Sequence, residues 1–242
     1  MEIEDVVVSV WKQALLARQT RLVFVKQIFT ANTRVFHFAS HGKLELADPR
    51  DLSTMPRDEF WLSYTAGRCT LMNLSVMLVL DALLERGLKI THHEFPNLRL
   101  HSVSIANLHF RLVQEIVWNI DGREIRPQHP KCQRFDCDDW DHWGHTVCST
   151  AWVSDEDNLE YFILDLTATQ FGHWQYVRCP SPKDENNRVP CALFTTEDVT
   201  FYDPRTPQQV RAWLTRAYNV EPGLCSEISM LSENATSEHL RK

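Results

Sequence analysis

Residues 145–170 read HTVCSTAWVSDEDNLEYFILDLTATQ, and this stretch decides the fold. Two apolar segments flank the polar run Ser154–Asn158, as two β-strands flank a turn. The stretch therefore predicts a β-hairpin in which His145 stands opposite Asp165. Because opposed residues point to the same face of a sheet, we expect the imidazole and the carboxylate to meet at the open end of the hairpin.

An imidazole beside a carboxylate is the orienting half of a nucleophilic triad, and Cys69 is the candidate nucleophile. Apolar residues recur at helical spacing after Cys69 as far as Arg86-Gly87, a typical helix end, so Cys69 is expected in the first turn of a helix. A helix N-terminus and a neighbouring imidazolium both lower the pKa of a thiol. The predicted roles are Cys69 as nucleophile, His145 as general base, and Asp165 as the group that orients the imidazole.

The order of these residues resembles the papain-like superfamily, in its transglutaminase-like and arylamine N-acetyltransferase-like branches. Residues 164–171 (LDLTATQF) are similar to the Asp-x-Thr-x-x-Gln motif of transglutaminase-like domains, and residues 68–73 (RCTLMN) to the Cys-x-x-x-Asn segment of the acetyltransferases. The Gly-Gly pair before the acetyltransferase cysteine and the Gln-Cys-Trp of transglutaminases are absent. Over about residues 60–175 the resemblance implies an α+β protein with a papain-like or transglutaminase-like core, its nucleophile helix packed on an antiparallel β-sheet.

The resemblance also implies a site beyond the triad. A donor from the segment before Cys69, together with the Cys69 backbone N–H, is expected to hold an oxyanion. An aromatic residue close to His145 is expected to line the acyl pocket or to shield the thiolate from water. The expected substrate-binding and oxyanion residues are Trp61, Tyr64, Gly67, Arg68, Trp143 and Gln170. Asn73 is interpreted as a surface or packing residue of the helix.

The length and composition are those of a globular protein with a substantial core. A chain of 242 residues, of which 43% are apolar, predicts a single catalytic domain over about 1–225. This domain divides into an N-terminal lobe of helix and strands at about 1–58 and a core at about 59–220. The polar residues 226–242 are expected to form a disordered tail.

Charge and cysteine content indicate the compartment. No apolar run approaches the roughly 20 residues of a membrane span, and acidic residues precede the first apolar run, opposite to a signal peptide. Seven cysteines, an odd number, argue against a disulfide scaffold and favour a reducing compartment. We therefore expect a cytoplasmic protein without membrane contact. A net charge of −7 argues against non-specific nucleic-acid binding.

The expected function is that of a cysteine-dependent acyltransferase or amide synthase working through a Cys69 acyl-thioester. The donor is a small-molecule or peptide thioester, ester or amide, the acceptor is an amine, and neither metal nor bound cofactor is required. Three alternatives stay open: a hydrolase, amidase or protease with water as acceptor; an amide synthase using an aminoacyl ester, including one borne by tRNA; and an inactive binding module of the same fold. The Cys- and His-containing segment 129–148 also has the residue types of a zinc site.

Overall fold

The computed structural model is an α+β protein in which helices pack against an antiparallel sheet. It describes residues 1–24, 36–38, 44–46, 61, 65, 68–92, 94–109, 118–120, 123–125, 145–171, 175–178, 188–195 and 200–241. Among these residues, no helix has both the length and the apolar character needed to cross a lipid bilayer. The α+β class expected from the sequence is confirmed.

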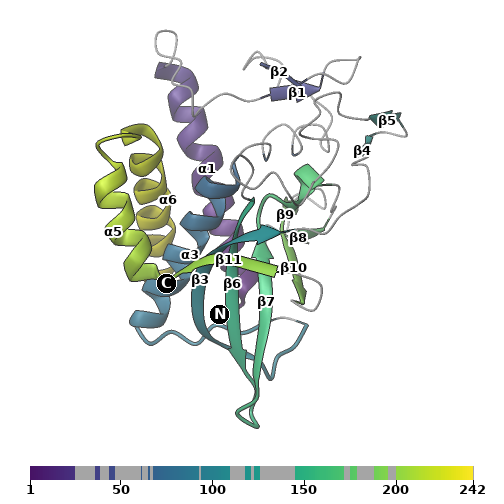
Figure 1. Ribbon diagram of the computed structural model, residues 1–242, viewed down its shortest axis with the longest axis vertical. Helices are drawn as coiled ribbons and strands as arrows, with labels where there is room; N and C mark the ends of the chain where they lie inside the picture. The colour runs from purple at the N-terminus through teal and green to yellow at the C-terminus, as the bar shows by residue number, and fades with distance from the viewer. Residues whose placement is uncertain are drawn as a thin grey trace.

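The central sheet has five strands in the order β10-β7-β6-β3-β11, and each neighbouring pair is antiparallel. Its strands are β3 (Arg99–His109), β6 (His145–Val153), β7 (Leu159–Asp165), β10 (Ala192–Thr195) and β11 (Thr200–Arg205). The predicted hairpin is therefore the β6–β7 pair, with β6 in the middle of the sheet. Figure 1 shows the turn of this hairpin projecting beyond the helices.

Among the described residues, three shorter antiparallel pairs lie outside the central sheet. They are β1 (Phe36–Phe38) with β2 (Leu44–Leu46), β4 (Trp118–Ile120) with β5 (Arg123–Ile125), and β8 (Tyr176–Arg178) with β9 (Arg188–Pro190). The β8–β9 pair contacts the first helix, whose Trp11 indole donates a hydrogen bond of 2.8 Å to the Pro190 carbonyl.

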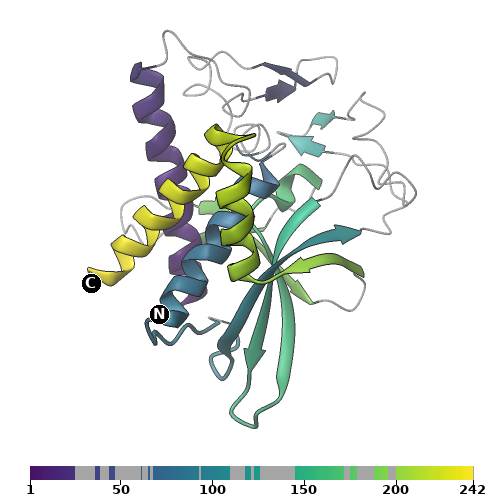
Figure 2. The same cartoon turned by 60° about the vertical axis from the view of Figure 1, so that its left-hand side comes forward.

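Four α-helices are described: α1 (Ile3–Phe24), α3 (Cys69–Glu85), α5 (Pro207–Ala217) and α6 (Pro222–Leu240), with a 3-10 helix η4 (Ala168–Phe171) after β7. The central helix is α3, which packs against β3 and β6 on one side and against α1 and α6 on another (Figure 2). A helix buried on most sides must be apolar nearly all round, and α3 is buried continuously from Leu71 to Leu80.

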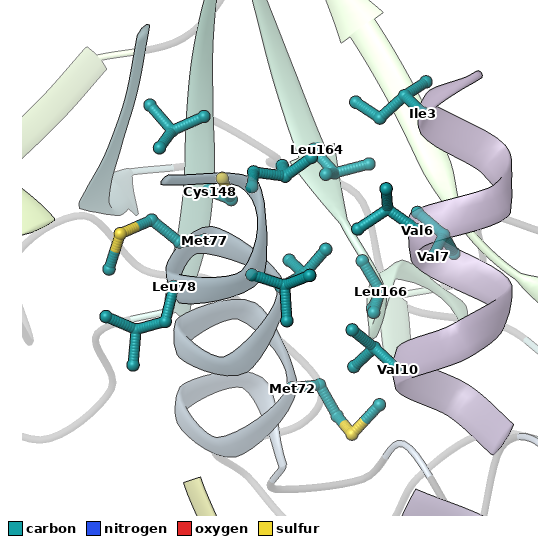
Figure 3. Packing of buried hydrophobic residues seen from close by; sticks show 14 of the residues in the cluster. Ile3, Val6, Val7, Val10, Met72, Met77, Leu78, Cys148, Leu164 and Leu166 are labelled. Atoms are coloured by element: carbon teal, nitrogen blue, oxygen red, sulfur yellow. The ribbon is translucent and has the colours of Figure 1, made fainter. Parts of the chain in front are cut away.

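The core fills the space between α1, α3 and the sheet. Val6 and Val10 of α1 and Met72 of α3 lie near Leu166, just after β7, in a cluster of fully buried side chains (Figure 3). Leu164 of β7 belongs to the same cluster. This packing fixes the first turn of α3 against the ends of the two central strands, where the triad was predicted.

The end of α3 falls where the sequence predicted it. Gly87 has a φ of +76°, a left-handed conformation that favours glycine. Its N–H donates to the Leu84 carbonyl at 2.8 Å, and the Leu88 N–H donates to the Leu83 carbonyl at 3.1 Å. These two bonds satisfy carbonyls that the helix end leaves without helical partners.

The C-terminal segment corrects a prediction. Residues 226–242 were expected to be disordered, but α6 runs from Pro222 to Leu240 and buries Ile228, Leu231 and Ala235 against α1 and α3. These residues recur at helical spacing, so the segment carries an apolar stripe despite its polar composition. Burial of that stripe stabilises the helix.

Candidate active site

Cys69 is the first residue of α3, as predicted. The residue as a whole is half-buried. Arg68 holds the N-cap position and is buried, and its carbonyl accepts the first helical bond from the Met72 N–H at 3.0 Å. The first N–H groups of an α-helix have no helical acceptor and carry the positive end of the helix dipole, which favours a thiolate.

The hairpin register differs from the predicted one by two residues. Val153 pairs with Leu159 and Cys148 with Leu164, so the register continues to Val147, and not His145, opposite Asp165. The reason is the loop between the strands. Ser154 closes it by donating its N–H to the Asn158 carbonyl at 3.0 Å, and this makes a five-residue loop centred on Glu156.

A shift of two residues leaves the predicted face unchanged, because side chains alternate along a strand with a period of two. His145 and Asp165 are therefore diagonal neighbours on one face. The His145 Nε2 and the Asp165 Oδ2 lie 2.5 Å apart, and both side chains are almost completely buried. Asp165 is the last residue of β7, so its carboxylate lies at the strand end beside the first residue of β6.

The third member of the group is Cys69, whose thiol lies close enough to the His145 imidazole for each group to shift the pKa of the other. Burial alone raises the pKa of the Cys69 thiol. The hydrogen bond and positive charge of His145, followed by the backbone N–H of Thr146, outweigh burial and bring that pKa below its ordinary value of 9.0.

The imidazole and the carboxylate shift in the directions that favour an ion pair. Burial lowers the pKa of His145, but the charge and hydrogen bond of Asp165, with a smaller contribution from Cys69, raise it to about 10. Burial raises the pKa of Asp165, while His145, Asn73 and Thr167 lower it below its ordinary value. These shifts all favour the charged forms, a thiolate, an imidazolium and a carboxylate in sequence.

Asp165 is oriented by two further side chains. Thr167 donates both its backbone N–H and its hydroxyl to Asp165 Oδ1, at 2.8 and 2.9 Å. Asn73 donates its amide to the same oxygen at 2.9 Å and to the Thr146 carbonyl at 2.7 Å, and its Oδ1 accepts the Leu166 N–H at 2.9 Å. Asn73 thus joins α3 to the ends of both central strands.

Asn73 was predicted to be a surface or packing residue of the helix, but its hydrogen bonds place it beside Asp165. It is fully buried and lies in the site, and not on the helix surface. The signal was an amide inside an otherwise apolar helix, four residues after Cys69 and so on the same helical face. A buried amide in such a position needs hydrogen-bond partners, and the triad provides one of them.

The remaining predicted residues lie in different surroundings. Trp61 is buried with its ring 4.9 Å from the Trp11 ring in an edge-on contact, and its carbonyl accepts a hydrogen bond from the Thr65 hydroxyl at 2.8 Å. The Thr65 hydroxyl also lies 2.7 Å from that of Thr169 in η4, the 3-10 helix that contains the backbone of Gln170. Tyr64, Gly67 and Trp143 lie outside the described residues, as do residues 129–144 of the proposed zinc segment.

Within the described ranges, no group of three or more His, Cys, Asp or Glu side chains is arranged to hold a metal ion. Cys148 of β6, the last cysteine of the segment with zinc-binding residue types, is buried in the hydrophobic core, and burial raises the pKa of its thiol. A neutral thiol facing apolar side chains is poorly suited to bind a cation.

No family model matches the chain, and no curated protein or solved structure is significantly similar to it. Function is therefore inferred from the geometry of the site. That geometry places a thiol, an imidazole and a carboxylate in sequence, the arrangement that a nucleophile, an acid–base group and an orienting carboxylate would need.

Proposed function

We propose that the protein is a cysteine-dependent acyltransferase that forms an acyl-thioester on Cys69 and passes the acyl group to an amine. The observation that carries the proposal is the chain of contacts from the Cys69 thiol through His145 to Asp165, at the N-terminus of a buried helix. We also propose that the protein resembles papain-like cysteine enzymes. The order of a cysteine on a helix, a histidine on a strand and an aspartate at the end of the next strand supports this.

The first chemical step is attack of the Cys69 thiolate on the carbonyl carbon of an ester, thioester or amide. A lowered thiol pKa increases the fraction of the nucleophile present as thiolate. The His145 imidazolium then gives its proton to the leaving group, and the acyl group stays on sulfur. Asp165 stabilises the imidazolium and holds the ring in place during this transfer.

Negative charge develops on the carbonyl oxygen during the attack. The first turn of α3 offers N–H groups without helical acceptors, and Cys69 is the first of its residues. Such donors stabilise an oxyanion next to the sulfur. The Cys69 backbone N–H is therefore the assigned oxyanion donor.

The second step resolves the thioester. An amine attacks the acyl carbon and gives its proton to the neutral His145, and the Cys69 thiolate leaves. The product is an amide. Water in place of the amine would release a carboxylic acid instead, which is the hydrolase alternative.

A reducing compartment, the cytoplasm, fits this chemistry. Cys69, Cys148, Cys191 and Cys225 are free thiols in the structure. An activated thiolate is easily oxidised, and a reducing environment protects it.

The test is the intact mass of the protein after incubation with a simple thioester such as an N-acetylcysteamine ester. We expect one acyl adduct that maps to Cys69, no adduct in Cys69→Ala, and discharge of the adduct to an amide when an amine is added. An adduct that appears equally in Cys69→Ala would refute the assignment of the nucleophile. Discharge at the same rate with and without amine would favour the hydrolase.

A further inference from the structure

A second feature adjoins the triad and takes no part in the steps above. A cavity of about 170 Å³ lies between α3, α5 and the edge of the sheet formed by β3 and β11. Its apolar walls include Leu74 of α3, Ile105 of β3, and Val210 and Trp213 of α5. An ion pair between Arg211 and Asp81, 2.6 Å apart, holds α5 against α3.

Thr146 connects this cavity to the reactive sulfur. Its backbone N–H helps to lower the pKa of the Cys69 thiol, and Thr146 is one of the residues that line the cavity. Thr70, the residue after Cys69, lines the cavity as well, and its hydroxyl lies 3.3 Å from that of Thr146. A group attached to the sulfur therefore has the cavity as its neighbour.

The cavity lies on the side of β6 away from the imidazole. Successive residues of a strand point to opposite faces, so the Thr146 side chain and the His145 side chain leave β6 in opposite directions. An incoming amine must reach His145 to lose its proton. The space on the Thr146 side is accordingly assigned to the acyl group and not to the acceptor.

The polar part of the cavity presents hydrogen-bond donors. Thr146 donates its hydroxyl to Asn107 Oδ1 at 3.2 Å, so the amide nitrogen is the donating end of the Asn107 side chain. Among the described residues that line the cavity, Arg205 alone is charged. A guanidinium with an amide donor matches a carboxylate, which offers only acceptors.

We propose that this cavity is the acyl subsite and that it takes a short acyl group ending in a carboxylate, that is, a dicarboxylic acid linked through one carboxyl. This inference rests on the acyl-thioester function proposed above. The cavity is of the right size, since about 150 Å³ holds a molecule as large as benzene. The apolar walls contact the methylene groups, and Arg205 with Asn107 binds the terminal carboxylate.

The step that the subsite serves is a thioester exchange. The Cys69 thiolate attacks the carbonyl of the donor, a bond forms between this carbon and the Cys69 sulfur, and the bond from the carbon to the donor sulfur breaks. The departing thiolate takes the proton of the His145 imidazolium. The terminal carboxylate keeps its charge throughout.

The experiment compares succinyl and butyryl thioesters of N-acetylcysteamine, which differ mainly in the terminal carboxylate. Single-turnover acylation of Cys69 is followed by intact mass. We expect wild-type protein to react with the succinyl ester about tenfold to hundredfold faster than with the butyryl ester, as for a hydrogen bond to a charged group. Arg205→Gln should remove most of this preference.

A matched control is Arg86→Gln, which removes the same charge at an exposed position at the other end of α3, about 25 Å from Cys69 by the rise of the helix. It should leave the preference as in the wild type. If Arg205→Gln does not fold, Asn107→Leu replaces it and should also reduce the preference.

The outcomes separate the two proposals. Equal acylation by both esters, or a preference that survives Arg205→Gln and Asn107→Leu, would overturn the subsite while leaving Cys69 as the acyl carrier. Failure of both esters to acylate Cys69 would reject the acyltransferase and the subsite together.

Discussion

Asn73→Ala should damage both the stability of the protein and the reactivity of Cys69. The substitution removes a hydrogen bond to the Asp165 carboxylate, worth about 1.5–3 kcal/mol. It also leaves the buried Leu166 N–H without its side-chain acceptor and the Thr146 carbonyl without the amide donor, and one such orphaned group costs about 1–3 kcal/mol. Since such contributions are not additive, we expect a loss of about 3–5 kcal/mol in the free energy of unfolding.

Urea unfolding followed by circular dichroism measures this loss, and a thermal melt should show Tm lowered by about 6–20 °C for a chain of this size. Asn73→Leu provides a sharper comparison, because it keeps the volume and removes the hydrogen bonds. The matched control is Ser75→Ala on the same helix, whose buried hydroxyl only supplements a helical bond to the Leu71 carbonyl, at 2.7 Å. It should cost less than about 1 kcal/mol.

Reactivity provides the second readout. Without Asn73 the Asp165 carboxylate is held less firmly, so the imidazolium that activates Cys69 is less well oriented. We expect iodoacetamide labelling of Cys69 near neutral pH to slow by about tenfold in Asn73→Leu, as expected when a supporting group is lost. If Asn73→Leu matches Ser75→Ala in stability and the wild type in labelling, Asn73 is a packing residue and our reasoning about it is refuted.

Three further predictions concern the triad and the C-terminal helix. His145→Ala should reduce acyl transfer to an amine about as much as Cys69→Ala does, and Asp165→Asn should reduce it less, because geometry partly survives; a fully active Asp165→Asn would contradict the role of the carboxylate. Between pH 6.5 and 9.0, and above the lowered pKa of Cys69, the folded and unfolded wild type each hold one proton on the Cys69–His145 pair. In Cys69→Ala, by contrast, the folded imidazole keeps a proton that the unfolded chain loses above pH 6.5. The free energy of unfolding of this variant, relative to that of the wild type, should therefore fall with rising pH by at most about 1.4 kcal/mol per pH unit. Urea unfolding at several pH values measures the sign of this change. Leu231→Ala in α6 should cost about 2–5 kcal/mol and exposed Glu233→Ala under about 0.5, and equal unfolding midpoints would contradict the packing of that helix.

The hairpin shows what periodicity predicts and where it stops. Alternation was sufficient to find β6 and β7 and to place His145 and Asp165 on one face, because that property survives any even shift of register. The register itself depends on the loop, where Asp157 takes a φ of 60° and Ser154 closes the turn. Which polar residue adopts the left-handed conformation is set by the folded loop, and several residues of this run accept it.

The hydrogen-bond partners of Asp165 could not be predicted from the sequence, for a different reason. The place of Cys69 in the first turn of a helix could be predicted, because it depends only on the residues that follow Cys69 in the sequence. The bonds of Asn73 join α3 to Thr146 and Leu166, which are distant in sequence, so no local pattern indicates them. For α6, the polar composition predicted disorder, although Ile228, Leu231 and Ala235 form an apolar stripe at helical spacing. The stripe is buried by α1 and α3, which are distant in sequence.

The most direct test of the central claim is the rate of Cys69 alkylation by iodoacetamide as a function of pH, with each labelled cysteine identified by peptide mass. If His145 holds Cys69 as a thiolate, labelling in the wild type is nearly independent of pH from the lowered pKa of Cys69 up to 9.0, while His145→Ala shows a rate that rises about tenfold per pH unit over the same interval. A wild-type rate that also rises about tenfold per unit up to pH 9.0 would contradict the thiolate–imidazolium pair and, with it, the proposed acyltransferase.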